Sequence, residues 1–159
     1  MAMAPSTAPE AEQIPVARQR TDDGFPPARF VVRPWIDPLV EEHGFPVNSP
    51  YTETVILPIL GPATTFCLRR LGTWVAAEPD GVTVDTVRLA SDLGLGHGVS
   101  RHSPMGRTLD RLCRFGMAKW CGGDMLVRTA VAPATERQLV RLSPMVVQVH
   151  RSMVGVDRS

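Results

Sequence analysis

The stretch that decides the fold is Leu89-Ala90-Ser91-Asp92-Leu93-Gly94-Leu95, followed by Thr108-Leu109-Asp110-Arg111-Leu112-Cys113-Arg114-Phe115-Gly116-Met117. In the first run, Leu89 and Leu93 lie one turn apart on a predicted helix over residues 86–93, which Asp85 can cap. The small Ala90 lets a following helix cross closely, and Gly94 supplies the left-handed backbone that a turn after a helix favours. The pattern predicts two helices that pack across each other.

The second run predicts an amphipathic helix that begins at Ser103-Pro104 and ends at Phe115-Gly116. Its apolar residues recur at helical spacing on one face: Met105, Leu109, Leu112 and Cys113. Gly122-Gly123-Asp124 then separates residues 117–121 from residues 125–131, which is typical of a β-hairpin. A helix followed by a hairpin is therefore expected here.

Four segments are expected along the chain of 159 residues. Residues 1–28 have almost no large apolar side chains, which predicts a disordered tail. Residues 29–61 predict an arm that docks on the core through short helices, one of them capped by Asp37; the many prolines of this region argue against a central strand. Residues 62–131 predict a helix over 62–77, a strand over 82–84, then the helices and hairpin above. Residues 132–159 predict C-terminal helices, the first opened by a capping box of Thr135 and Gln138.

This order of elements resembles that of the winged helix-turn-helix proteins over residues 62–131. The run from Leu89 resembles the second helix and turn of that family, and the run from Thr108 resembles its recognition helix and the entry to its wing. The stretch from Gly94 to His102 is longer than the family's usual turn. The resemblance implies an α+β, predominantly helical protein, a winged helix-turn-helix with an N-terminal arm and a C-terminal helical extension. It also implies DNA binding and transcriptional regulation.

The charge distribution supports the same function. The formal net charge is +1, yet residues 101–151 hold nine basic and three acidic side chains, a net of +6. Arginines lie opposite the apolar face of the predicted helix, and a helix start with free backbone N–H groups favours a phosphate. Arg and Lys contacts to phosphates give affinity, and Arg contacts to guanine give sequence preference. We predict that double-stranded DNA is bound by Arg101, His102, Ser103, Arg107, Arg111, Arg114, Lys119 and Arg128. Gly106, which costs about 1 kcal/mol of helix propensity relative to Ala, would let a phosphate approach the helix backbone.

Two alternatives stay open. Asp110 can pair with Arg107 and Arg114, which would leave a solvated helix face on a non-enzymatic protein-interaction module with a winged-helix scaffold. A ligand-responsive regulator, with a small pocket between the arm and the helix that bears Trp74, is a weaker hypothesis. In the DNA-binding case a homodimer is expected, through the arm around Trp35 and Phe45 or through the apolar residues of the last helix. These residues are Leu142, Met145, Val146, Val149 and Met153.

Several classes of protein are not expected. The sequence contains no run of about 18 apolar residues, so a membrane helix is not expected. The first residues do not resemble a secretory signal. The three cysteines, Cys67, Cys113 and Cys121, are scattered and match no disulfide framework or metal motif, so a cytoplasmic protein without metal or cofactor is expected. The sequence shows no nucleophilic or acid–base constellation, and we predict no catalysis.

Overall fold

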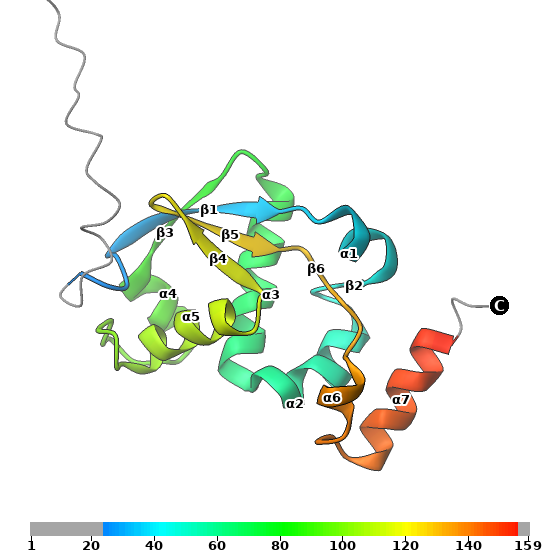
Figure 1. The fold of residues 1–159 in the computed structure, drawn as a ribbon. Coiled ribbons are helices and arrows are strands. Elements are labelled where there is room, and N and C mark those ends of the chain that lie inside the picture. The colour runs from blue at the N-terminus through cyan, green and yellow to red at the C-terminus, as the bar shows by residue number, and fades with distance from the viewer. Residues whose placement is uncertain (1–23, 156–159) are drawn as a thin grey trace, which may run out of the picture.

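The computed structural model describes residues 24–155 and shows an α+β fold. Four strands form a mixed sheet in the order β3-β1-β5-β4. Helices α3, α4 and α5 lie along one side of this sheet (Figure 1). The strands are β1 (Arg29–Trp35), β3 (Val82–Asp85), β4 (Ala118–Cys121) and β5 (Asp124–Arg128), and a second, two-stranded sheet joins β2 (Phe45–Pro46) to β6 (Ala130–Val131). The helices are α1 (Pro38–His43), η3 (Thr52–Ile56), α2 (Leu57–Leu60), α3 (Pro62–Ala77), α4 (Thr86–Asp92), α5 (Pro104–Arg114), α6 (Glu136–Leu139) and α7 (Pro144–Gly155).

Strand β1 lies inside the sheet, which corrects the prediction of an arm docked on a complete domain. It runs antiparallel to β3 and parallel to β5. The prolines permit this because residues 28–33 contain none. Phe30 and Val32 face the core and alternate with the less buried Arg29, Val31 and Arg33. Pro34 follows the part of β1 that pairs with β3, which spans residues 29–32 only. It therefore needs no N–H for that neighbour.

Residues 25–28 also differ from the prediction, since they contact the domain and are not part of a tail. The ring of Phe25 meets that of Trp120 edge to face, with centroids 5.6 Å apart. Thr86 donates its backbone N–H to the carbonyl of Ala28 (3.0 Å) and its hydroxyl to the carbonyl of Pro27 (2.5 Å). The rest of the predicted tail lies outside the described residues, as do residues 156–159.

The predicted helix starts are confirmed by their caps. Asp37 accepts from the N–H of Leu39 at the start of α1, and Asp85 accepts from that of Arg88 at the start of α4. The capping box of Thr135 is present at α6. The segment after Ser49 is less regular than the spacing predicted. It forms the π-helix η3, in which the N–H of Leu57 bonds to the carbonyl of Thr52, and then continues as α2.

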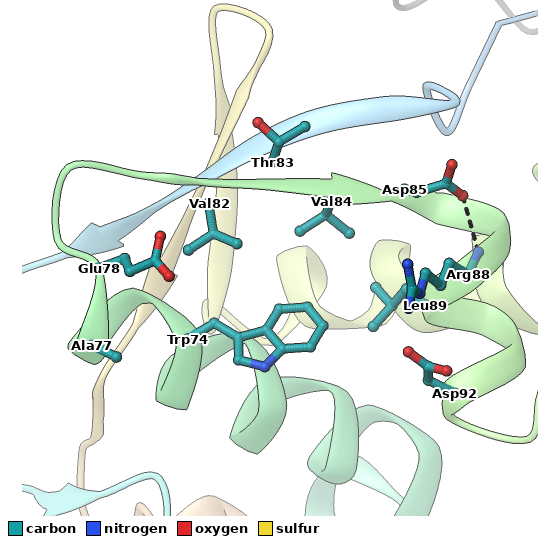
Figure 2. Close-up of a pocket in the computed structure, with 10 residues that line it drawn as sticks. All are labelled: Trp74, Ala77, Glu78, Val82, Thr83, Val84, Asp85, Arg88, Leu89 and Asp92. Atoms are coloured by element: carbon teal, nitrogen blue, oxygen red, sulfur yellow. Dashed lines mark hydrogen bonds between the residues drawn. The ribbon is translucent and has the colours of Figure 1, made fainter.

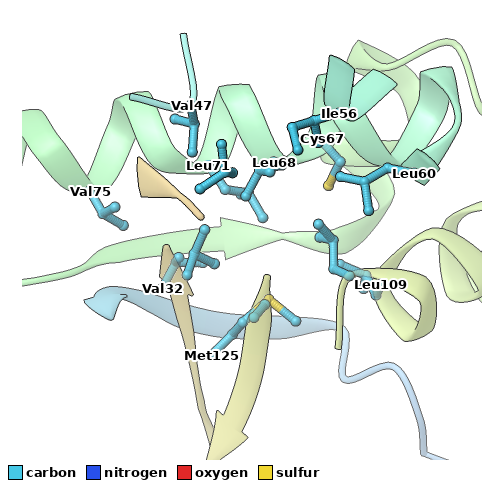
Figure 3. Close-up of a cluster of buried hydrophobic side chains, with 14 of the residues drawn as sticks. Val32, Val47, Ile56, Leu60, Cys67, Leu68, Leu71, Val75, Leu109 and Met125 are labelled. Atoms are coloured by element: carbon cyan, nitrogen blue, oxygen red, sulfur yellow. The ribbon is translucent and has the colours of Figure 1, made fainter. Parts of the chain in front are cut away.

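The main core lies between α3, the sheet and α5. Leu68, Leu71 and Val75 project from α3 toward Val32 and Met125 of the sheet (Figure 3), and all of them are fully buried. Leu109 and Leu112 close the core from α5, as their predicted apolar face required. Burying one such side chain contributes about 1.5–3 kcal/mol, so this contact fixes the position of α5 against the sheet.

Candidate nucleic-acid interface

Helix α5 is the element on which most of the predicted DNA contacts lie. The side-chain oxygen of Ser103 accepts from the N–H of Gly106 (3.1 Å), and Pro104 occupies the first turn. The buried side of the helix faces α3 and the sheet. The exposed side carries Arg107, Asp110, Arg111 and Arg114. The predicted division of α5 into an apolar face and a cationic face is therefore confirmed.

Arg111 is bound to the protein itself. Its Nε donates to the carbonyl of Leu60 (2.6 Å), and its Nη2 donates to the carbonyl of Ile59 (3.3 Å). These carbonyls lie at the C-terminal end of α2, where a helix leaves its last oxygens without partners and its dipole favours a cation. The guanidinium also lies over the ring of Phe115, 4.8 Å from the centroid. Arg111 therefore joins α5 to α2 and does not extend freely into solvent.

Arg107 and Arg114 occupy the remaining cationic positions on this face. Arg107 is exposed and lines a shallow hollow of about 240 Å3 beside Gly61 and Pro62, at the corner between α2 and α3. Arg114 forms an ion pair with Asp110 one turn earlier, and its side chain stays 71% exposed. An exposed pair of this kind contributes little stability, so its arginine can exchange the partner for a phosphate.

The loop before α5 folds back on the first turn of the helix. The hydroxyl of Ser103 donates to the carbonyl of Ser100 (2.6 Å) in addition to capping the helix. A Cβ at Gly106 would overlap the same carbonyl oxygen and lie 2.7 Å from that of Arg101. Gly106 thus makes room for this loop and not for a phosphate, which corrects the prediction. Ser103 is buried in a structural role, whereas Arg101 and His102 are exposed.

The two cations of the hairpin, Lys119 and Arg128, lie over the ring of Trp35. The ring of Trp35 lies 3.8 Å from the Arg128 guanidinium carbon and 4.2 Å from Lys119 Nζ, measured to the ring centroid. Arg128 also donates to the carbonyl of Gly116 (2.7 Å) and lies 3.5 Å from a carboxylate oxygen of Asp37, with its side chain only 17% exposed. Cation–π contact and these bonds hold Arg128 in place. The sequence placed Trp35 in a candidate dimer surface and not beside Lys119 and Arg128, because the pairing of β1 with β5 is long-range.

The predicted contact residues therefore divide between two surfaces. In β4 and β5 the buried residues Ala118 and Val127 face the helices, so Lys119 and Arg128 project from the opposite side of the sheet. The hairpin turn itself consists of Gly122 and Gly123, between the paired residues Cys121 and Asp124, and brings no cation. Only the residues of α5 and its preceding loop lie together on the helical side.

Two of the three cysteines have raised pKa values. Burial raises the pKa of Cys67 to about 12, and burial together with the nearby Asp110 carboxylate raises the pKa of Cys113 to about 11. Both thiols stay protonated at neutral pH and are poor nucleophiles. Within residues 24–155, no group of three His, Cys, Asp or Glu side chains could hold a metal ion, and no helix is long and apolar enough to cross a membrane.

Comparison with protein-family models, curated proteins and solved structures finds no match to this chain. The geometry of its own residues therefore carries the functional argument.

Proposed function

We propose that the protein binds double-stranded DNA as a winged helix-turn-helix regulator of transcription, with α5 as its recognition helix. The order α3, β3, α4, α5 and the β4–β5 hairpin is the order that the resemblance implies. The observation that carries the proposal is the exposed face of α5, on which Arg107 and Arg114 project while Leu109 and Leu112 anchor the helix. A rigid helix with exposed arginines suits the major groove of DNA.

The contact surface is smaller than the sequence predicts. Arg107 and Arg114 on α5, with Arg101 and His102 in the preceding loop, would contact DNA. Ser103, Arg111 and Arg128 have structural partners, and Lys119 lies over Trp35 on the other side of the sheet. Contacts to the DNA backbone would come from the helix side alone.

A salt-dependent binding assay tests this proposal. Fluorescence anisotropy with a labelled DNA duplex should show an affinity that falls steeply as salt rises, because bound phosphates release counterions. Arg107→Ala should weaken binding by about 1–3 kcal/mol if the side chain reads a base, or lower the salt slope by about one if it contacts a phosphate. Arg137→Ala, which removes the same charge from α6, is the matched control and should bind like the parent. Binding that does not depend on salt, or equal binding by Arg107→Ala, would overturn the proposal.

Exposed apolar side chains favour a second candidate, a protein-interaction module. Leu39 on α1 is 69% exposed, and Val140 and Met145, beside α6 and on α7, are 79% and 69% exposed. Exposed large apolar residues can belong to protein contact surfaces, and these three lie on two separate parts of the fold, α1 and the region of α6 and α7. In this case the partner would bind the arm or the C-terminal helices, or a second copy of the chain would form a homodimer there.

Two measurements separate this candidate from DNA binding. Light scattering of the parent and of Met145→Lys would show whether a dimer forms and whether this position lies in its interface. A protein contact of apolar character should respond weakly to salt, whereas DNA binding should weaken steeply.

A further inference from the structure

A groove lies beside Trp74, between the C-terminal half of α3, strand β3 and helix α4. Its volume is about 460 Å3, within the usual range for small-molecule sites. In Figure 2 the Trp74 indole lies in the middle of the groove, with β3 above it and Leu89 of α4 at one side. Val82 and Val84 complete the apolar wall. The groove thus differs from the pocket considered in the sequence, which was expected between the arm and α3.

The charged residues of the groove are mostly acidic. Glu78, Asp85 and Asp92 line it together with one cation, Arg88. Asp85 is engaged, since it caps α4 and lies 3.8 Å from Arg29. Within the described part of the chain, the carboxylates of Glu78 and Asp92 have neither a hydrogen-bond nor an ion-pair partner. The lining itself therefore holds three carboxylates against one cation, and Arg70 lies beside Asp92 because its Nη1 donates to the Asp92 backbone carbonyl (3.1 Å). The carboxylates of Glu78 and Asp92 are available to a ligand.

The two available carboxylates flank the indole. In Figure 2, Glu78 lies at one end of Trp74 and Asp92 at the other, beyond Leu89. An indole face attracts a cation through its quadrupole and an alkyl chain through apolar contact. An anion such as a nucleotide would be repelled by this arrangement. The arrangement suits a ligand with positive charge at both ends and an apolar middle.

We propose that this groove binds an extended organic dication, two ammonium groups joined by an alkyl chain. One ammonium pairs with Glu78, the other pairs with Asp92, and the chain lies along Trp74 and the apolar wall formed by Val84 and Leu89. Arg88 and Arg70 both lie near the second ammonium and oppose it. The site is separate from the cationic face of α5, so it stands whether or not the protein binds DNA.

Calorimetric titration of the full chain with 1,5-diaminopentane, in the absence of DNA, tests the proposal. We expect saturable binding that weakens with salt, because both ion pairs are exposed to solvent. Pentylamine, which has the same chain and one charge, should bind at least several-fold more weakly. No saturable binding of the diamine up to about 10 mM would overturn the proposal.

Substitutions of the lining residues should change the affinity for the diamine in different directions. Glu78→Gln and Asp92→Asn should each weaken binding several-fold, while Arg88→Ala should tighten it by removing one of the opposing charges. Trp74→Leu should weaken binding several-fold, because the alkyl chain loses the flat indole face along which it lies. Trp74 also packs on the core, so Trp74→Leu can fail to fold. In that case the Glu78→Gln variant, at an exposed residue, tests the proposal.

A matched control keeps the result specific. Glu136→Gln removes one carboxylate from α6, outside the groove, and should bind the diamine like the parent. In amide NMR spectra the diamine should shift the signals of Ala77 and Val84 and leave that of Lys119 unchanged. Equal weakening by Glu136→Gln and Glu78→Gln, or shifts spread over the whole surface, would show non-specific charge attraction and would overturn the proposal.

Discussion

The phenolic oxygen of Tyr51 lies 2.7 Å from Nδ1 of His150, and this buried bond ties the C-terminal helix α7 to η3. The same oxygen accepts the backbone N–H of Ala134 (2.8 Å). The oxygen accepts that N–H through one lone pair, and its own proton can be donated to His150 Nδ1 when the imidazole is neutral with its proton on Nε2. The ring of Tyr51 is also stacked on that of Phe45, with centroids 3.9 Å apart. Tyr51 thus connects α7, the segment before α6 and strand β2.

Tyr51→Phe removes the hydroxyl and keeps the stacked ring. The N–H of Ala134 loses its acceptor and His150 Nδ1 loses its donor, both in buried surroundings. An unsatisfied buried polar group costs about 1–3 kcal/mol, so the free energy of unfolding should fall by about that amount. Urea denaturation measures the change. Hydrogen exchange should also become faster in α7, and an unchanged exchange rate there would show that Tyr51 does not hold this helix.

The attachment of α7 should weaken in acid. Burial lowers the pKa of His150; the Glu136 carboxylate acts in the opposite direction, and Arg151 lowers the pKa further. Above the ordinary histidine pKa of about 6.5 both states are neutral, and the full stability is present. As the pH falls below this value, the unfolded state binds a proton first, and stability is lost by up to about 1.4 kcal/mol per pH unit until the lowered pKa is reached. Denaturation between pH 7.5 and about 4.5 should show this slope, and His150→Gln should remove it. If His97→Gln, which changes an exposed histidine, removed the slope instead, the assignment would be wrong.

The local elements could be predicted from sequence because their signals are short-range. The cap residues Asp37, Asp85 and Ser103 accept the bonds that their positions predicted, and the two-glycine turn of the hairpin is present. Helix α3 runs from Pro62 to Ala77, as its spacing predicted. Each of these features depends on residues a few positions apart, which a pattern in one sequence can reveal.

The parts that could not be predicted depend on long-range contacts. Strand β1 gains its two neighbours from residues 82–85 and 125–128. The partners of Arg111 could not be predicted for the same reason. Helical periodicity placed Arg107 and Arg111 on one exposed side of α5, but it could not show that the carbonyls of α2 lie beside Arg111. The indole of Trp35 under Lys119 and Arg128 follows from the position of β1. The exposure of a side chain can be predicted from helical periodicity, whereas its hydrogen-bond and cation–π partners depend on the tertiary structure.

Gly106→Ala should destabilise the protein although alanine favours helices. Propensity alone predicts a gain of about 1 kcal/mol. The added Cβ would overlap the carbonyl oxygen of Ser100, a backbone atom that the Ser103 bonds hold in place. Overpacking of this kind costs about 1–3 kcal/mol, so thermal denaturation should show a lower midpoint. Gly155→Ala, at the end of α7 with open space around its Cα, is the control and should be neutral or slightly stabilising. A Gly106→Ala variant more stable than the parent would show that the 100–101 loop moves away easily.

Arg111→Ala separates the structural arginine of α5 from those proposed to contact DNA. The change removes two hydrogen bonds to the carbonyls of Ile59 and Leu60 and the contact with Phe115. Hydrogen bonds from a charged group contribute about 1.5–3 kcal/mol, and with the donor at least partly exposed we expect a loss of about 1–2 kcal/mol in the free energy of unfolding. Arg111→Lys should recover only part of it, because a lysine lacks the planar fork that reaches both carbonyls. Arg107→Ala, one turn earlier on the same face, should leave the unfolding midpoint within experimental error. Equal stability of the Arg111 and Arg107 variants, together with a larger loss of DNA affinity in Arg111→Ala, would show that Arg111 leaves α2 to contact DNA.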